Sequence, residues 1–449
     1  MSAPAAHAVE RRSVLEQALA PFAQVRAGEA MTALLLMINV FLLLTAYYVI
    51  KVVREPLILA GGGAEVKSYS AAGQALLLLA LVPAYGAFAS RVDRVKLITG
   101  VTLFFASNLA IFYLLARVHM PFLGVAFFLW AGVFNLMIVA QFWAFANDVY
   151  TPEQGRRLFA IVGIGASTGA IAGAWLAKQL IKPLGIYPLM LVAAALLLLS
   201  IALTRMVNAR ERAAQTAAAG APIERPLGRE DGFALVFGQR YLLLIALLSM
   251  LLNFVNTNGE YILGKTLVTV LGKMAAQGAA AGTAPDDWTK QQIGLFYADY
   301  FGWVNLIGAL VQLFVVSRVL TRFGVRVALF VLPLIALGGY GLLAAAPILG
   351  YIKVAKILEN STDYSLQNTA RHALFLPTSR EAKYKAKAAI DSFFVRGGDL
   401  LSSGLVFVGA QLLSLRPQGF AVVNLVLVFL WITVVVLIGR EHRKLTEGP

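Results

Sequence analysis

Charged and polar side chains recur at helical spacing within one apolar part of the chain, residues 353–371. Their steps of three and four residues would place them on one stripe of an α-helix, while the side chains between them are mostly apolar. The stripe consists of Lys353, Lys356, Asn360, Asp363, Gln367 and Arg371. We therefore predict a helix that turns one face to lipid or packed helices and the other to a wet cavity.

Further charges lie where apolar runs begin or end. Lys51 and Arg54 are three residues apart and share a helical face; they either snorkel to the membrane interface or face the same cavity. Later in the chain, two acid–base pairs can each meet on their own helix, and such pairing makes buried charge tolerable. These pairs are Lys387 with Asp391 and Arg396 with Asp399. The second half of the chain still offers more cations than acids, which favours an anionic ligand.

A phosphate-loop pattern is also present, but in the wrong context. Residues 259–266 read GEYILGKT and fit GxxxxGK[ST]. That loop needs a glycine-rich turn between a strand and a helix, whereas this stretch lies inside the apolar run 241–271, and the chain has no βαβ pattern. We therefore predict neither an NTPase nor another enzyme. The chain has no cysteine and four scattered histidines, so we expect no metal and no cofactor.

The composition of the chain is that of an integral membrane protein. Of its 449 residues 59% are hydrophobic and 14% are charged, with a mean hydropathy of +0.76. The net charge of +15 resides largely in short loops, which indicates positive-inside topology rather than nucleic-acid binding. Windows of about 20 apolar residues predict twelve transmembrane helices. They lie near 31–53, 68–90, 96–116, 121–147, 159–181, 186–207, 240–272, 292–317, 325–345, 347–376, 386–412 and 417–438.

The predicted spans divide into two halves of six, residues 31–207 and 240–439. We expect a cytoplasmic amphipathic segment at 1–30, a cytoplasmic linker at 208–239 and a cytoplasmic tail at 440–449, with no cleavable signal peptide. Ser-Arg-Val follows the second span of each half, at 90–92 and 317–319. Two six-helix halves in parallel repeat predict an all-α, major facilitator superfamily-like fold with its ligand between the halves. The basic loops predict an inner (plasma) membrane protein with both termini inside.

Several short segments resemble the nucleotide transporter family, the ATP/ADP translocases of plastids and intracellular bacteria. The similar segments are IKVVREPLILAGGGAE at 50–65, FWAFANDVYTPEQGRRLFAIVGIGAS at 142–167, DYSLQNTARHALFLP at 363–377 and KYKAKAAID at 383–391. The resemblance implies passage of a nucleotide or similar phosphorylated anion by alternating access, without hydrolysis. The chain departs from the members that exchange ATP for ADP at Ala71, Asn256, Gly259, Glu260, Asp363, Arg371 and His372.

We therefore expect a monomeric secondary transporter in the lipid bilayer that binds a nucleotide, acts as an exchanger, and has no nucleic-acid partner. Its expected phosphate contacts are Lys51, Arg54, Lys353, Lys356, Arg371 and Lys387. Asn360, Tyr364 and Gln367 would meet base and ribose, and Asp391 and Arg396 would organise the eleventh span. Asp363 is also expected among the substrate-binding residues, and the expected coupling or specificity positions are Asn256, Glu260, Asp299 and His372. The alternative is a proton-coupled major facilitator carrier of another organic solute, with Glu260, Asp299, Asp363 and Asp391 as proton sites.

Overall fold

The computed structural model describes residues 14–19, 23–26, 28–89, 93–215, 232–279, 282 and 284–447, and within them it contains helices and no strand. More than half of the predicted N-terminal segment lies outside the described residues, as do half of the predicted linker and the whole of the first Ser-Arg-Val motif. The phosphate-loop pattern at 259–266 is continuous helix. Its backbone amides are used within the helix, so they cannot cradle a phosphate.

The chain order of the helices follows the predicted spans closely. The first half contains α1 (Val14–Leu19), α2 (Ala30–Ala89), α3 (Arg94–Arg117), α4 (Leu123–Val149), α5 (Pro152–Leu184) and α6 (Leu189–Gln215). The second half contains α7 (Gly232–Gly238), α8 (Arg240–Met274), η1 (Ala275–Ala279), α9 (Pro285–Val311), η2 (Gln312–Val316), α10 (Ser317–Ala345), α11 (Leu349–Thr362), η3 (Asp363–Gln367), α12 (Asn368–Ala373), η4 (Ala382–Ala386), α13 (Lys387–Ala389), η5 (Ile390–Phe394), α14 (Val395–Phe407), η6 (Val408–Leu412) and α15 (Pro417–Glu447). The η elements are π-helical.

Nine helical stretches of the described chain are long and apolar enough to cross a membrane, and two of them are long enough to cross it twice. Ala30–Val82 has 53 residues and breaks at Gly63, whose φ is 74°. Pro285–Ala345 has 61 residues and breaks at Gly324, whose φ is 76°. Only glycine adopts this left-handed conformation readily, which is why the chain reverses there. With α11 to α12 as the interrupted tenth span, each of the twelve predicted spans has a helical counterpart.

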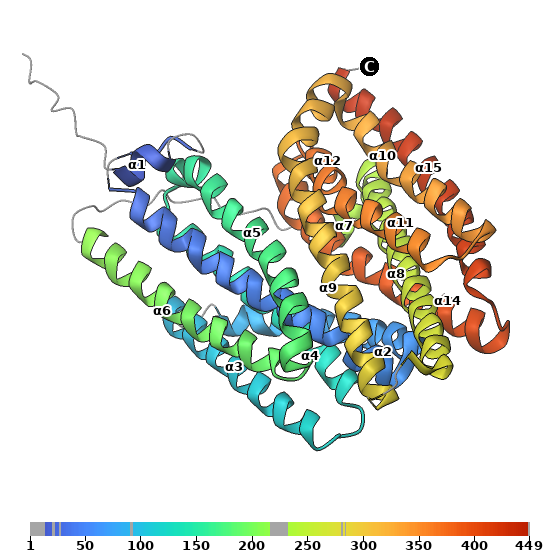
Figure 1. Ribbon diagram of the computed structural model, residues 1–449. Coiled ribbons are helices and arrows are strands. Elements are labelled where there is room, and N and C mark those ends of the chain that lie inside the picture. The colour runs from blue at the N-terminus through green and yellow to red at the C-terminus, as the bar shows by residue number, and fades with distance from the viewer. Residues whose placement is uncertain are drawn as a thin grey trace, which may run out of the picture.

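The helices form two bundles that meet along a few of their members (Figure 1). In the first bundle α2 packs against α4, α5 and α6; in the second, α8 packs against α14 and α15, and α10 against α15. The bundles touch where α2 contacts α8, α9 and α14 and where α5 contacts α9. The two parts of α2 therefore lie at the centre of the molecule.

Small residues let α5 approach α2. A Cβ atom on Gly165, Gly169 or Gly173 would come within 2.2–2.4 Å of a carbonyl oxygen of α2, so only glycine fits there. The carbonyls belong to Met37, Phe41 and Thr45. A Cβ on Gly163 would meet nothing within 4 Å, so three of the four glycines of α5 between residues 163 and 173 lie at this close approach.

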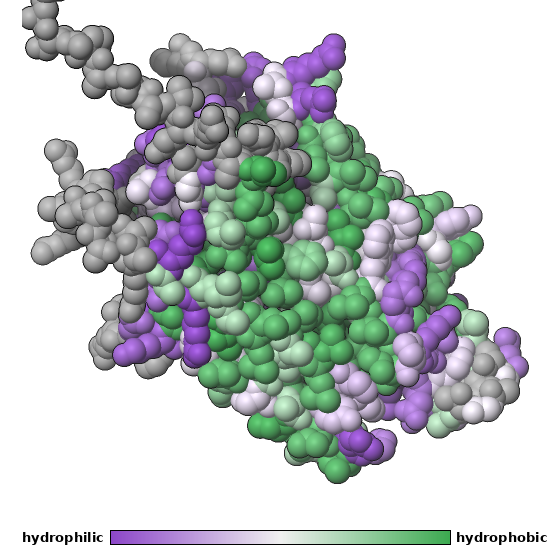
Figure 2. Space-filling view, turned by 60° about the vertical axis from the view of Figure 1, so that its left-hand side comes forward, coloured by the Kyte–Doolittle hydropathy of each residue, from purple (hydrophilic) through white to green (hydrophobic). Residues whose placement is uncertain are grey.

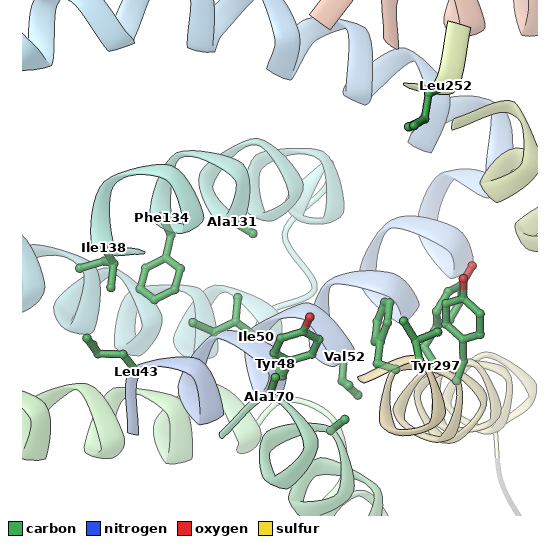
Figure 3. Packing of buried hydrophobic residues seen from close by; sticks show 14 of the residues in the cluster. Leu43, Tyr48, Ile50, Val52, Ala131, Phe134, Ile138, Ala170, Leu252 and Tyr297 are labelled. Atoms are coloured by element: carbon green, nitrogen blue, oxygen red, sulfur yellow. The ribbon is translucent and has the colours of Figure 1, made fainter. Parts of the chain in front are cut away.

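Buried apolar side chains surround α2, and apolar side chains also cover the outside. Figure 3 shows Leu43 and Ile50 of α2 facing Phe134 and Ile138 of α4, with Tyr297 of α9 at the far end of the cluster. The face of the molecule in Figure 2 is a broad apolar belt with hydrophilic residues gathered at its margins. Such a surface is expected of a protein whose surrounding medium is lipid.

Candidate functional site

A cavity of 270 Å³ lies between the two bundles. It is lined by α2 and α4 from the first half and by α8, α9, α11, η3 and α14 from the second. Its charged and polar lining residues are Lys51, Arg54, Lys67, Gln74, Asn135, Asn256, Thr257, Glu260, Asn360, Tyr364, Arg396 and Asp399. Four of them are cations and two are carboxylates. The lining is therefore polar and carries more positive than negative charge.

Two of these cations share one buried carboxylate. Glu55 is 0% exposed; its Oε1 accepts a hydrogen bond from Arg54 Nε at 3.0 Å, and its Oε2 accepts one from Lys67 Nζ at 2.6 Å. Arg54 precedes the Gly63 reversal and Lys67 follows it. The guanidinium of Arg54 also lies 4.8 Å from the ring centre of Phe128. One carboxylate thus holds two cations at the cavity wall and neutralises only one of them.

Lys51 lies one turn before Arg54 and has no carboxylate partner. Within the described chain its ammonium makes no hydrogen bond or ion pair. It instead lies 4.3 Å from the ring centre of Phe301, 5.3 Å from that of Tyr48 and 5.9 Å from that of Tyr364. An ammonium has three donors, and aromatic rings satisfy none of them as fully as an anion would. Lys51 is therefore the cavity cation best placed to receive an anionic ligand.

Glu260, one of the two cavity acids, belongs to a hydrogen-bonded group. Its Oε1 accepts hydrogen bonds from the Tyr300 hydroxyl at 2.9 Å and from Asn360 Nδ2 at 3.0 Å. Behind it, Lys356 Nζ lies 3.8 Å from the same oxygen and donates to Asn256 Oδ1 at 2.6 Å. Lys356 is 1% exposed. Lys356 also lies 3.1 Å from Glu359, so Glu260 shares this cation with a second carboxylate.

Asp399, the other cavity acid, fixes α14 against α8. Its Oδ1 accepts hydrogen bonds from Asn253 Nδ2 and Thr257 Oγ1, both at 2.8 Å, and its Oδ2 accepts one from Arg396 Nη1 at 3.3 Å. One turn on, Ser403 Oγ donates to the backbone carbonyl of Ser68 in the other half, at 2.6 Å. The predicted pairing of Arg396 with Asp399 is present.

The stripe at residues 353–371 does not face the cavity as one surface. Of its six members Asn360 alone is among the cavity-lining residues. Lys353 pairs with Asp299 at 2.6 Å, and Arg371 lies 3.9 Å from Asp391. Lys353 and Lys356 precede the π-helical segment at 363–367 and bind Asp299 and Asn256. The wider turn of that segment shifts the register of the side chains that follow it, including Arg371. The steps of three and four residues hold for a regular α-helix.

The other predicted site residues are distributed around the cavity. Tyr364, Asn256 and Glu260 line it. Gln367 is 1% exposed, and neither polar atom of its side chain has a hydrogen-bond partner within the described chain. Lys387 Nζ lies 3.4 Å from Asp391, as its spacing predicted, away from the cavity lining. Outside that lining are also Asp363 in η3 and His372 in α12.

A second cavity, of 800 Å³, continues from the first on the side of the predicted cytoplasm. It shares Leu136 and Arg396 with the central cavity and is lined by both halves, including Val82, Lys385 and Asp391. On the opposite side, near the Gly63 reversal, the halves are joined by ion pairs. Lys265 pairs with Glu65 at 2.6 Å, and Lys178 contacts Asp299, which also binds Lys353. The halves are therefore joined by ion pairs on the predicted outer side and separated by a cavity on the other.

Sequence reasoning missed several cavity residues. Lys67 is a lone cation at the start of the second apolar run, a signal as strong as that of Lys51. Gln74, Asn135 and Thr257 are single uncharged polar residues in apolar spans, which carry little signal by themselves. A Cβ on Gly132 would lie 2.2 Å from the amide carbon of Gln74, so the glycine makes room for that side chain.

The fold and the cavity define the class of protein. An all-helical membrane protein with two bundles around a central polar cavity has the architecture of a major facilitator-type transporter. Solved structures agree: the chain superposes on the nucleoside transporter NupG with a TM-score of 0.61 at 14% identity, covering 91% of this chain and 98% of that one. A POT family transporter in complex with 5-aminolevulinic acid gives a TM-score of 0.61 at 13% identity, covering 93% and 97%. The predicted fold class is confirmed.

The sequence comparisons confirm the resemblance to the nucleotide transporters. Residues 302–442 match the family described as TLC ATP/ADP transporter. The chain is 25% identical over 367 residues to ADP,ATP carrier protein 1 of Chlamydia trachomatis, covering 72% of this chain and 63% of that protein. It is 22% identical over 354 residues to ADP,ATP carrier protein 1 of Rickettsia bellii, covering 70% and 68%. The chain spans less than two thirds of the length of the chlamydial carrier. These relatives are carriers rather than enzymes.

Proposed function

We propose that this protein is a secondary transporter that moves a nucleotide or related phosphorylated anion across a membrane by alternating access, as an exchanger. The observation that carries the proposal is Lys51, a cation without an anionic partner within the described chain, in a cavity that already holds an excess of positive charge. In a low-dielectric setting such a charge calls for an anion. The names of the relatives, which are ADP,ATP carriers, supply the nucleotide.

The proposed binding mode divides the cavity by chemistry. Lys51, Arg54 and Lys67 would contact the phosphates, because the Gly63 reversal brings Lys67 to the same wall. Phosphate oxygens are the acceptors that ammonium and guanidinium groups bind best. Aromatic rings at the same cavity would stack on the base, and neighbouring amides would hydrogen-bond to base or ribose. These aromatic residues are Tyr47, Phe128, Phe301 and Tyr364, and the amides are Gln74, Asn135, Asn256 and Asn360.

Exchange rather than net flux follows from the same charge. Reorientation of the empty carrier would carry an uncompensated cation through the closed, low-dielectric state, which is costly. A bound anion removes that cost, so the loaded carrier reorients and the empty one does not. We further propose that the protein acts as a monomer in the inner (plasma) membrane, with both termini cytoplasmic.

The test is counter-exchange in proteoliposomes. Vesicles preloaded with ATP, ADP, AMP or a nucleoside are supplied with each labelled nucleotide in turn, and uptake is compared with that of empty vesicles. We expect uptake that depends on an internal phosphorylated nucleotide, is lost in Lys51→Ala and is retained in Lys273→Ala, a control at an exposed lysine far along α8. No uptake of any nucleotide under any preload would overturn the proposal.

A second candidate function is a proton-coupled carrier of another organic solute, favoured by Asp363. This carboxylate lies in the π-helical segment η3 and has no hydrogen-bond or ion-pair partner within the described chain. The other predicted proton sites are engaged: Glu260 by Tyr300, Asp299 by Lys353, and Asp391 by Lys387. An unpaired acid in a membrane helix is a position for a proton.

A protonophore separates the two candidates. Uptake by a proton-coupled carrier would collapse when the proton gradient is dissipated, and Asp363→Asn would abolish the gradient-driven part. Pure exchange would continue unchanged under both conditions. Uptake of an uncharged solute that follows the gradient would favour the second candidate.

A further inference from the structure

A third cavity lies on the outside of the second bundle, away from the central cavity. Its volume is 470 Å³, and it is formed where the start of α10 lies beside the end of α15. Figure 1 shows these two helices side by side, with the end of the chain at the same end of the molecule as α1. The cavity is lined by Arg326, Phe330, Val435, Val436, Gly439, Arg440, Arg443 and Lys444. Among the residues whose side chains the structure describes, four cations and no carboxylate therefore line it, together with apolar side chains.

The cavity lies where apolar surface gives way to charge. Along one face of α15, Phe429 and Val436 are followed by Arg440 and Arg443 at helical spacing. Phe429 is 59% exposed and Val436 is 38% exposed. This face therefore changes, within two turns, from a surface suited to acyl chains to one suited to an anion. On α10 the order along the chain is reversed, with the cation Arg326 before the apolar Phe330. Since α10 begins where α15 ends, the charges of both helices lie at the same end of the cavity.

The two helices are fitted to each other at Gly439. A Cβ there would lie 3.4 Å from Cδ and 3.6 Å from Cγ of Arg326, so the aliphatic stem of Arg326 rests on α15 at the glycine. A larger residue than alanine would compete with that stem for space. Gly439 thus lets a cation from α10 join the cations of α15 around one cavity.

Three of the four cations of the cavity, Arg326, Arg443 and Lys444, already interact with other groups of the protein. Glu441, an acid next to the cavity, pairs with Lys444 at 3.0 Å and lies 3.8 Å from Arg240. Arg440 is exposed and makes no hydrogen bond or ion pair within the described chain. A phosphate group bound here would meet several guanidinium donors, which bind phosphate strongly.

We propose that this cavity binds the phosphate headgroup of an anionic phospholipid. The phosphate would lie among Arg326, Arg440 and Arg443, and an acyl chain would run along Phe429 and Val436. A basic cavity between transmembrane helices, at the cytoplasmic edge of the bilayer, suits an anionic lipid. The exposed apolar surface directly beneath the charges favours a lipid over a free phosphate ion, which would gain nothing from it.

The experiment measures lipid binding by the full chain in a neutral detergent. Phosphatidylglycerol, cardiolipin, phosphatidylcholine and inorganic phosphate are titrated in turn, with thermal stabilisation and native mass spectrometry as readouts. We expect the two anionic lipids to bind and stabilise, and phosphatidylcholine and phosphate to have no comparable effect. The double variant Arg440→Gln/Arg443→Gln should bind the anionic lipids about tenfold or more weakly, since each cation near the surface contributes to such binding.

Two further variants sharpen the result. Arg322→Gln removes an exposed arginine of α10 that does not line the cavity and should bind like the unaltered protein. Gly439→Leu keeps every charge but fills the space beside Arg326, and it should weaken binding even if the double variant does not fold. Equal stabilisation by phosphate, equal binding of phosphatidylcholine, or unaltered binding by both the double variant and Gly439→Leu would overturn the proposal. No transport is measured, so the outcome is independent of the proposed function.

Discussion

Glu65 of the first half and Lys265 of the second half form an ion pair of 2.6 Å near the reversal of α2. Their side chains are 19% and 42% exposed, so the pair is partly hydrated and of modest strength. Together with the contacts of Asp299 it joins the two halves on the predicted outer side. In an alternating-access cycle this pair must break whenever the cavity opens outward.

We predict that Glu65→Gln raises access to the cavity from the outer side by up to about fivefold, because a partly exposed ion pair contributes about 1 kcal/mol or less. The chain has no cysteine, so Asn135→Cys in the cavity supplies the only thiol. The rate at which a membrane-impermeant thiol reagent labels that position from outside is the measurement.

The matched control for Glu65 is Glu153→Gln, which removes an exposed pair within the first half, Arg26 with Glu153. It should leave the labelling rate unchanged. Equal labelling rates in Glu65→Gln and the unaltered protein would show that the pair does not hold the outer side closed.

Lys51→Ala should weaken nucleotide binding about 10- to 100-fold, the effect of losing a charge-assisted hydrogen bond worth about 1.5–3 kcal/mol. It should lower the stability of the empty protein only slightly, since within the described chain Lys51 contacts aromatic rings and has no polar partner to strand. Isothermal titration of ADP and thermal unfolding without ligand measure the two effects separately. A large loss of stability in the empty protein would contradict this assignment.

Lys67→Met should behave in the opposite way. Its removal leaves Glu55, which is fully buried, with Arg54 as its one cationic partner, and the free energy of unfolding should fall by about 1–3 kcal/mol. Thermal unfolding in detergent measures the change. Adding Glu55→Gln removes the buried charge, so the double variant should regain part of the stability. If the loss of unfolding free energy in the double variant equalled the sum of the losses in the two single variants, the two residues would not be coupled.

Gly169→Ala tests the packing of α5 on α2. The new Cβ would lie 2.4 Å from the carbonyl oxygen of Phe41, and the resulting overpacking should cost about 1–3 kcal/mol. Gly163→Ala, on the same helix, meets nothing within 4 Å and serves as the control. Equal unfolding temperatures for the two variants would mean that the helices are farther apart than described.

Much of the fold was predictable because the membrane imposes a length on every apolar run. The reversal of α2 was predictable as well, because the apolar windows are interrupted between residues 53 and 68. The helical steps of Lys387 and Asp391, and of Arg396 and Asp399, were sufficient to predict their pairing, since both partners of each pair lie on one helix.

The site was less predictable because its charges are balanced across the fold. The sequence predicted an excess of unpaired cations in the second half. In the structure Lys353 pairs with Asp299 on α9. Lys356 pairs with Glu359 on its own helix and donates a hydrogen bond to Asn256 on α8. No local pattern announces a π-helical segment at 363–367. The partner of a buried charge is determined by tertiary packing. Partners that lie far apart in the sequence therefore cannot be identified from the spacing of residues in one sequence.

The cluster of Arg54, Glu55 and Lys67 also limits how such a protein can change over generations. The same carboxylate that presents two cations to the cavity fastens the helix before Gly63 to the helix after it. A single replacement among these three residues that changes ligand binding therefore also weakens the contact between the two parts of α2. These three positions should accordingly vary as a set among relatives, and new ligand preferences should arise more readily at Lys51, which can be replaced alone.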